Sequence, residues 1–332
     1  MKKIYNPKSD EVINTIVNGN PTGIANFVTP SRPIYKTIFE TMLANFWNPA
    51  TVNITEDKKA VKLLSEDEYR AYELTFGKLI FNDSIVTNRL MDNVNPIITD
   101  PIGNACIALQ SGQEATHSYS YAFIGDDILG STNIYNLFKT DEKLLHLTQR
   151  INSRYSVFDT NEEIPDSSKS LVAIANLILE GVSFPAGFVV VWSLGNKMQG
   201  SANMITEISR DELNTHLPLY VNIYKHIKED TGVNFDDVAK KWIEQAVEDE
   251  IEFLEYSTTG VMGFNTTSIK DFMYWIGDNR LRELGIKSDY IYNKNDGLIK
   301  LFKSYSEHNS TKGNFFETNV SAYSKQALDM DF

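Results

Sequence analysis

A glutamate, a histidine and a tyrosine follow one another at helical spacing, as Glu114, His117 and Tyr121. Asp100 is a typical helix N-cap and is followed by a proline, so we expect a helix from about 100 to 124. Residues three or four apart share one face of a helix, so the carboxylate and the imidazole can bind one metal ion together. The phenol lies one turn further along the same side. A Glu-x-x-His motif is common by chance, and its meaning depends on the rest of the chain.

Three more acids stand inside apolar stretches that have helical periodicity: Asp83, Glu180 and Glu212. Burying an ionised carboxylate costs several kcal/mol unless it is paired or bound to a cation. A salt bridge or a solvated edge would explain any one of these acids. With Glu114 there are four of them, and four such acids together favour a cation site. Glu180 is the most informative, because it is the only charged residue between 171 and 194.

A second histidine, His216, follows Glu212 by four residues instead of three. Four carboxylates and two imidazoles suit two first-row metal ions. In four-helix bundles such a site takes one acid from each of two helices and a Glu-x-x-His pair from each of the other two. The extra residue leaves His216 within reach and predicts a π-bulge. The alternative is that His216 is not a ligand and that Thr215 or water takes its place. The remaining histidines do not belong to such an acid–histidine motif, and we expect them on the surface or in the core: His146, His226 and His308.

Stretches with helical periodicity account for most of the chain, and two-residue alternation is scarce, so we predict an all-α protein. We expect an irregular N-terminal arm at 1–32, one helical domain at 33–285, and a mobile polar tail at 286–332. The expected helices cover about 34–46, 65–90, 100–124, 132–140, 141–157, 171–194, 202–228, 235–257 and 268–284.

The 332-residue chain has a formal net charge of −13 and a pI of about 4.9, which argues against nucleic acid or an anionic membrane as a partner. Its one cysteine, Cys106, excludes an internal disulfide framework and fits a reducing cytosol. The N-terminus has no signal-peptide pattern. The longest apolar run that we identify, 184–194, is too short to span a bilayer. We therefore predict a soluble cytoplasmic protein.

These residues resemble the small, radical-generating subunit of class I ribonucleotide reductase, from Trp47 to Phe332. The family's separate motifs are matched by 46–49, 82–85, 114–121, 180–184, 209–212 and the C-terminal segment 314–332. The resemblance implies a ferritin-like helical bundle with a dimetal-carboxylate site between four long helices. It also implies two metal ions per chain, iron first, with manganese or a mixed pair as alternatives. The implied ligands are Asp83, Glu114 and His117 in one half and Glu180, Glu212 and His216 in the other.

By the same resemblance, Tyr121 carries a stable radical. Phe184, Phe188 and Ile208 are similar to the apolar residues that wall the radical pocket in the family, although plain core packing explains them equally well. Gln110 stands where some members have tryptophan, so a hydrogen bond to the ligands is expected to differ there.

The resemblance further implies a relay that begins at Trp47 and Asp211 and continues at Tyr323 in the tail. The tail, which ends at Phe332, would dock on the large catalytic subunit that reduces ribonucleotides. Such a partner must supply the thiols, because Cys106 alone is too few. The chain would also form a homodimer.

Two other functions share some of these residues. A stand-alone dimetal-carboxylate oxidase or oxygenase would need the metal ligands but neither Tyr323 nor a docking tail. A non-enzymatic ferritin-like iron-binding protein would need neither Tyr121 nor the tail. Tyr121 and the tail therefore favour the reductase subunit.

Overall fold

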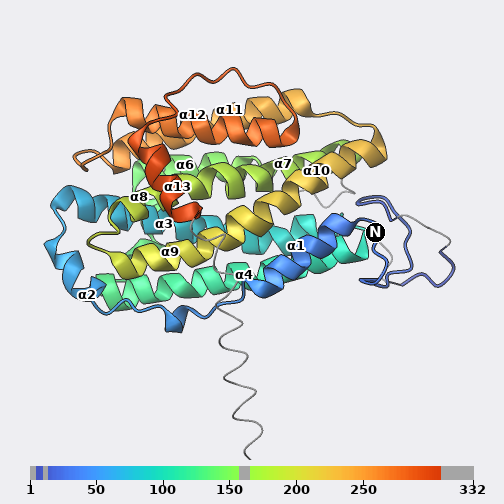
Figure 1. Cartoon of the computed structure of the whole chain (residues 1–332), viewed down its shortest axis with the longest axis horizontal. Helices are drawn as coiled ribbons and strands as arrows, with labels where there is room; N and C mark the ends of the chain where they lie inside the picture. Colours follow the sequence, from blue (N-terminus) through green and yellow to red (C-terminus); the bar gives the residue numbers. More distant parts are fainter. Residues whose placement is uncertain (1–4, 10–13, 157–164, 308–332) are drawn as a thin grey trace, which may run out of the picture.

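The computed structural model describes residues 5–9, 14–156 and 165–307, and every regular element in these ranges is a helix (Figure 1). The all-α prediction is confirmed. The long central helices are α3 (Glu66–Arg89), α4 (Pro101–Phe123), the run from α7 (Asp166–Ile178) through η7 (Leu179–Ser183) into α8 (Phe184–Ser193), and the run from α9 (Gln199–Asp211) through η8 (Glu212–His216) into α10 (Leu217–Thr231).

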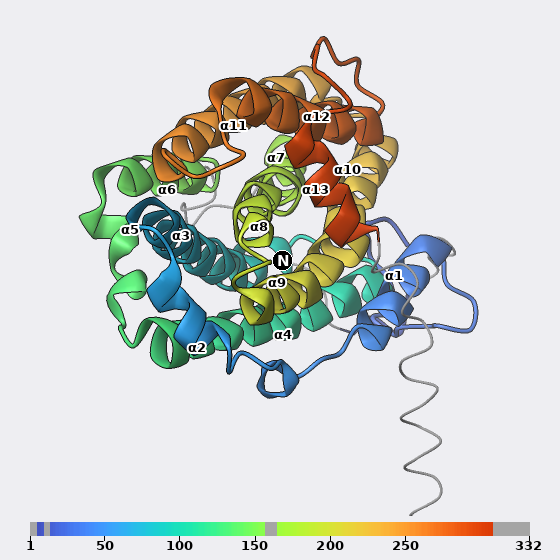
Figure 2. The ribbon, with the colours of Figure 1, turned by 60° about the vertical axis from the view of Figure 1, so that its left-hand side comes forward.

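The other helices surround this bundle. Figure 2 shows α11 and α12 as a layer on one side of α7 and α8, and α1 lies against α4. The outer helices are α1 (Pro33–Ala44), α2 (Asp57–Ala60), α5 (Leu137–Thr140), α6 (Glu142–Ser153), α11 (Asp236–Ser257), α12 (Thr266–Leu284) and α13 (Gly297–Ser306). The remaining short segments are η1 (Pro49–Thr51), η2 (Val61–Leu63), η3 (Leu90–Val94), η4 (Ile124–Leu129) and η5 (Asn133–Tyr135).

The two helices that carry the first ligand candidates begin at residues that cap them, and the predicted cap at Asp100 is confirmed. Ser65 and Glu68 form a capping box at the start of α3, with Ser65 Oγ accepting from Glu68 N at 3.2 Å and Glu68 Oε2 accepting from Ser65 N at 2.9 Å. Asp100 Oδ1 accepts from the backbone N–H of Ile102 and Gly103 at the start of α4. Each cap satisfies amide groups that the helix itself leaves free, and is worth about 1 kcal/mol.

Three π-helical segments end two residues before a proline, at Pro96, Pro185 and Pro218. A proline has no N–H for the carbonyl four residues earlier, and its ring crowds that carbonyl. In η7 and η8, a wider π turn ahead of the proline relieves this conflict, and the chain continues as a helix into α8 and α10. The π-bulge predicted between Glu212 and His216 is confirmed as η8.

The chain is helical beyond residue 285, where we expected irregular structure. Asp296 caps α13, and Leu298, Ile299 and Phe302 are buried against α8 and α12. The helix has only ten residues and three buried apolar positions, so its apolar periodicity extends over too few residues to stand out in the sequence. Residues 308–332 of the expected tail lie outside the described residues.

The apolar helix at Ser168–Ser193 is long and apolar enough to cross a membrane by length and composition, so our expectation that no run is long enough was wrong. The expected run left out the apolar residues of this helix that precede position 184. The most apolar window of this segment is wholly buried inside the protein, however, as in the core helix of a soluble protein. The protein is therefore soluble.

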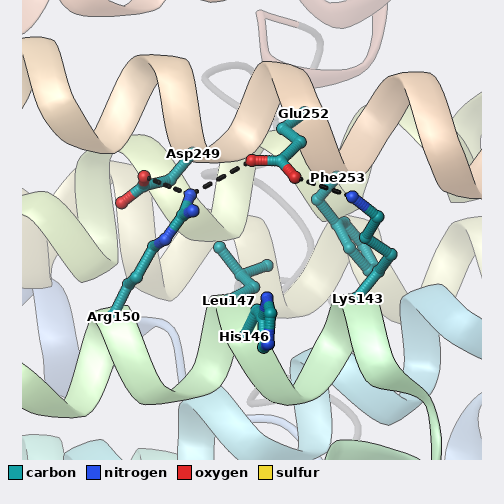
Figure 3. Close-up of a pocket in the computed structure, with 7 residues that line it drawn as sticks. All are labelled: Lys143, His146, Leu147, Arg150, Asp249, Glu252 and Phe253. Carbon is teal, nitrogen blue, oxygen red and sulfur yellow. Dashed lines mark hydrogen bonds and ion pairs between the residues drawn. The ribbon is translucent and has the colours of Figure 1, made fainter.

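Surface ion pairs join α6 to α11 around a small pocket (Figure 3). Arg150 lies 2.9 Å from Asp249 and 3.2 Å from Glu252, which also lies 2.9 Å from Lys143. His146 lines this pocket and is not one of the candidate ligands.

Candidate metal centre

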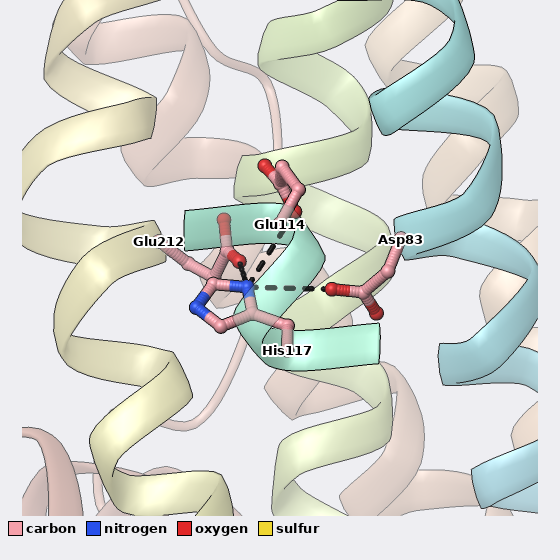
Figure 4. Close-up of side chains that lie close together, drawn as sticks. All are labelled: Asp83, Glu114, His117 and Glu212. Carbon is pink, nitrogen blue, oxygen red and sulfur yellow. Dashed lines mark ion pairs between the residues drawn. The ribbon is translucent and has the colours of Figure 1, made fainter. Parts of the chain in front are cut away.

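The six expected ligands come together in the core of the bundle, and each is fully buried: Asp83, Glu114, His117, Glu180, Glu212 and His216. They form two groups whose ligand atoms lie within 4.8 Å of one another, and both groups contain Glu114 and Glu212. These two glutamates therefore lie between the two halves of the cluster. Figure 4 shows the half that contains Asp83 and His117.

Four separate elements supply these side chains. Asp83 comes from α3, and Glu114 and His117 come from α4. The other half comes from the two π segments, with Glu180 in η7 and Glu212 at the start of η8. In η8 the wide turn leaves His216 Nδ1 2.8 Å from Glu212 Oε2, so the four-residue spacing still brings the pair together.

Both imidazoles turn Nδ1 towards the acids. His117 Nδ1 lies 2.9 Å from Glu212 Oε1, 3.3 Å from Asp83 Oδ1 and 3.5 Å from Glu114 Oε2 (Figure 4). His216 Nδ1 lies 3.2 Å from Glu114 Oε1. In both rings Nδ1 faces the other candidate ligands and could bind a metal ion, and Nε2 points away from them, to Asp211 in His117 and to Gln113 in His216.

Five of the candidate ligand atoms make no hydrogen bonds, although they are buried. They are Asp83 Oδ1, Glu114 Oε2, His117 Nδ1, Glu180 Oε2 and Glu212 Oε1. Buried polar atoms are costly to leave without partners, and a metal ion satisfies several of them at once. Carboxylate oxygens and imidazole nitrogens suit iron and manganese. The cluster therefore fits two metal ions, iron or manganese.

Without metal the cluster retains protons. Burial raises the pKa of Asp83 to about 7 and raises that of Glu180 well above its ordinary value. Burial lowers the pKa of His216, but the carboxylates of Glu212 and Glu114 outweigh it and raise that pKa to about 10. Metal binding must therefore displace protons from these groups.

Asp211 lies directly behind the ligands. Its Oδ2 accepts a hydrogen bond from His117 Nε2 at 3.0 Å and another from Trp47 Nε1 at 3.0 Å. Asp211 therefore pairs with both Trp47 and a candidate ligand histidine. A carboxylate in this position holds the imidazole ring in a fixed orientation.

Gln110 occupies the position at which we expected a hydrogen bond to the ligands to differ from that of family members with tryptophan. Its Nε2 donates to Glu114 Oε1 at 3.1 Å and to Glu180 Oε1 at 2.9 Å, and its Oε1 accepts from Tyr220 at 2.8 Å. The Gln110 amide therefore links Glu114, which belongs to both halves, to Glu180 of the second half.

Tyr121 is fully buried, and its hydroxyl donates to Asp83 Oδ2 at 2.8 Å. Burial and the neighbouring Asp83 raise the pKa of this phenol well above its ordinary value, so it stays protonated. The ring that contacts Tyr121 is Phe76, with 6.0 Å between centroids. Phe184, Phe188 and Ile208 are fully buried. This burial is expected both for residues that wall a radical pocket and for ordinary core residues.

Sequence reasoning missed three residues of this site: Phe76, Gln113 and Tyr220. Gln113 bonds to both Asp211 and His216. A signal for it was present, because polar residues recur at 110, 113, 114 and 117 on one face of the helix. No local signal marked Phe76 or Tyr220. The expected relay residue Tyr323 and the terminal Phe332 lie outside the described residues.

Comparison with known proteins identifies the family. The model of the family "Ribonucleotide reductase, small chain" matches residues 25–296. The ribonucleoside-diphosphate reductase subunit beta of Treponema pallidum is 32% identical over 327 residues, which cover 95% of this chain and 92% of that protein.

The ribonucleotide reductase R2 subunit from Clostridium botulinum has a TM-score of 0.85 at 28% identity, covering 92% of this chain and 98% of that one. A putative class I ribonucleotide reductase from Bacillus halodurans has a TM-score of 0.75 at 26% identity, covering 82% and 100%. Since the family model matches most of a ferritin-like bundle with a buried cluster of carboxylates and imidazoles, the chain belongs to the ribonucleotide reductase small-chain family.

Proposed function

We propose that Tyr121 of this small chain is oxidised to a neutral radical beside a dimetal centre. Its oxidising equivalent then passes to the large subunit, where ribonucleotides are reduced to deoxyribonucleotides. Small chains of this family work with a large subunit and form dimers. The observation that carries the proposal is the 2.8 Å hydrogen bond from the buried Tyr121 hydroxyl to Asp83 Oδ2.

Asp83, Glu114 and His117 would hold one metal ion, and Glu180, Glu212 and His216 the other. When bound, the metal pair supplies the oxidising power through activation of molecular oxygen. Oxidation of a phenol to a neutral radical removes one electron and one proton. Here the proton can move along the existing hydrogen bond to a carboxylate, and the surrounding core excludes water.

The proton acceptor distinguishes Tyr121 from the two other buried tyrosines near the cluster. Tyr220 donates to the side-chain amide of Gln110, and Tyr155 donates to that of Asn176 at 3.3 Å. An amide oxygen is a much weaker base than a carboxylate, so loss of an electron from these phenols leaves their proton without a good acceptor. This difference favours Tyr121 as the residue that is oxidised.

We assign the beginning of the relay to Trp47 and Asp211. Trp47 is half-buried, so it connects the hydrogen-bonded interior to the surface. The next member would be Tyr323, in a tail that docks on the large subunit through its end at Phe332. The lone Cys106 is buried, so the reducing thiols belong to the partner. A reduced, buried cysteine in an acidic soluble chain also fits the cytoplasm.

Reconstitution of the metal-free protein tests the proposed function. Addition of Fe(II) or Mn(II) in air should produce a tyrosyl radical signal in electron paramagnetic resonance, and nucleotide reduction should appear only after the large subunit is added. Zn(II), which has no redox chemistry, should yield neither result. Two bound ions without a radical or any reduction would favour an oxidase or an iron-binding protein instead.

Removal of residues 325–332 should abolish nucleotide reduction while leaving metal content and the radical signal unchanged, because the docking segment is lost but the buried centre is not. Tyr323→Phe should keep the affinity for the large subunit and lose the reduction. Full activity of the truncated chain would exclude docking through the tail.

A further inference from the structure

Gln113 lies beside the metal centre without being one of its expected ligands. It precedes Glu114 on α4 and is only 4% exposed. Its amide nitrogen lies 3.0 Å from Asp211 Oδ1, and its amide oxygen lies 3.0 Å from His216 Nε2. One side chain therefore contacts both the residue behind the first half of the centre and a histidine of the second half.

The direction of these hydrogen bonds follows from the orientation of His216. Its Nδ1 faces Glu212 and Glu114, so a neutral ring that gives this nitrogen to a metal ion carries its proton on Nε2. Nε2 then donates to the amide oxygen of Gln113. The amide nitrogen, which can only donate, in turn donates to the carboxylate of Asp211.

Asp211 thereby collects three donors. His117 and Trp47 donate to its Oδ2, and Gln113 donates to its Oδ1. A continuous chain of hydrogen bonds runs from His216 through Gln113 and Asp211 to Trp47. Gln113 joins the outward nitrogen of His216 to this chain.

The outward partners of the two histidines are not equivalent. His117 donates to a carboxylate and His216 donates to a neutral amide. A hydrogen bond to a charged acceptor is roughly twice as strong as one between neutral groups, and it makes the imidazole a more basic ligand. The two halves therefore differ in donor strength although each contains one histidine.

We propose that Gln113 is a positioning residue that orients His216, joins it to Asp211, and makes the two metal positions unequal. This inference rests on the proposed function, because it concerns the same centre and the same relay. It predicts that loss of the Gln113 amide weakens one bound ion far more than the other.

Gln113→Met tests the proposal, because methionine has a similar length and volume but cannot make either hydrogen bond. We expect the wild-type chain to bind two Mn(II) ions in an anaerobic titration followed by the electron paramagnetic resonance of free Mn(II). In the variant, one ion should bind about 10–100-fold more weakly, the usual effect of losing the partner of a ligand histidine, and the other should change little. Because this readout counts ions, it does not depend on enzyme activity.

Gln245→Met is the matched control, since Gln245 on α11 also donates to an aspartate, Asp249, but lies on the surface away from the centre. It should bind both ions like the wild type. Gln113→Leu provides a second variant, and binding is compared only between proteins with wild-type helical circular dichroism. If Gln113→Met or Gln113→Leu binds both ions normally, or weakens both equally, the role of Gln113 is overturned while the centre stands. If the wild type itself fails to bind two ions, the proposed centre fails and this inference fails with it.

Discussion

Tyr121→Phe is expected to abolish both the tyrosyl radical and ribonucleotide reduction while two metal ions still bind. The substitution removes one hydroxyl from a fully buried ring, so the fold and the six candidate ligands remain. It removes the phenolic proton and the hydrogen bond to Asp83 Oδ2, and phenylalanine cannot be oxidised to a phenoxyl radical. Metal analysis, electron paramagnetic resonance and nucleotide reduction with the large subunit measure the three effects separately.

Tyr220→Phe is the matched control for this experiment. It removes a hydroxyl of equal burial whose acceptor is the amide of Gln110. We expect this variant to keep the radical and most of the activity. A Tyr121→Phe protein with the wild-type radical spectrum, or a Tyr220→Phe protein without one, would contradict the assignment to Tyr121.

Lys78→Met is expected to lower the free energy of unfolding of the metal-free protein by about 3–5 kcal/mol, the usual cost of removing one partner of a buried ion pair. Lys78 Nζ lies 2.7 Å from Glu250 Oε2 and donates to the carbonyl of Ser183 at 2.6 Å. Both charged side chains are about 1% exposed. Burial lowers the pKa of Lys78 and raises that of Glu250, so neither charge is stable in the core without the other. Urea unfolding followed by circular dichroism measures the loss.

The double variant Lys78→Met/Glu250→Leu should recover most of this stability, because no charge is then left in the core. A remainder of about 1–3 kcal/mol is expected from the Ser183 carbonyl, which loses its donor. Lys143→Met removes an exposed pair with Glu252 and should cost less than about 1 kcal/mol. Equal losses for Lys78→Met and Lys143→Met would show that the buried pair contributes nothing special.

This ion pair also connects two elements of the metal centre. Lys78 lies on α3, five residues before Asp83, and Ser183 ends the π segment that carries Glu180. No pattern in the sequence predicted it, because a lysine among apolar residues of a long helix is ordinarily read as solvent-exposed.

The sequence alone predicted the elements whose cause is local. The cap at Asp100, the π-bulge after Glu212 and the helical class all depend on residues within one or two turns of each other. Local reasoning failed at α13, where three buried positions were too few to show a period. It also underestimated the apolar segment at Ser168–Ser193, whose burial is a property of the whole bundle.

The six candidate ligands could be selected from the sequence because a carboxylate inside an apolar stretch is costly wherever the chain takes it. Their arrangement could not, since the deciding contacts join residues far apart: 94 positions for His117 and Asp211, 103 for His216 and Gln113, and 105 for Lys78 and Ser183. Helical periodicity relates a residue only to its neighbours on the same helix. The sequence by itself therefore determined which groups must find partners in the core. Only the tertiary packing decided that Glu114 and Glu212 lie between the two halves and that Asp211 collects three hydrogen bonds.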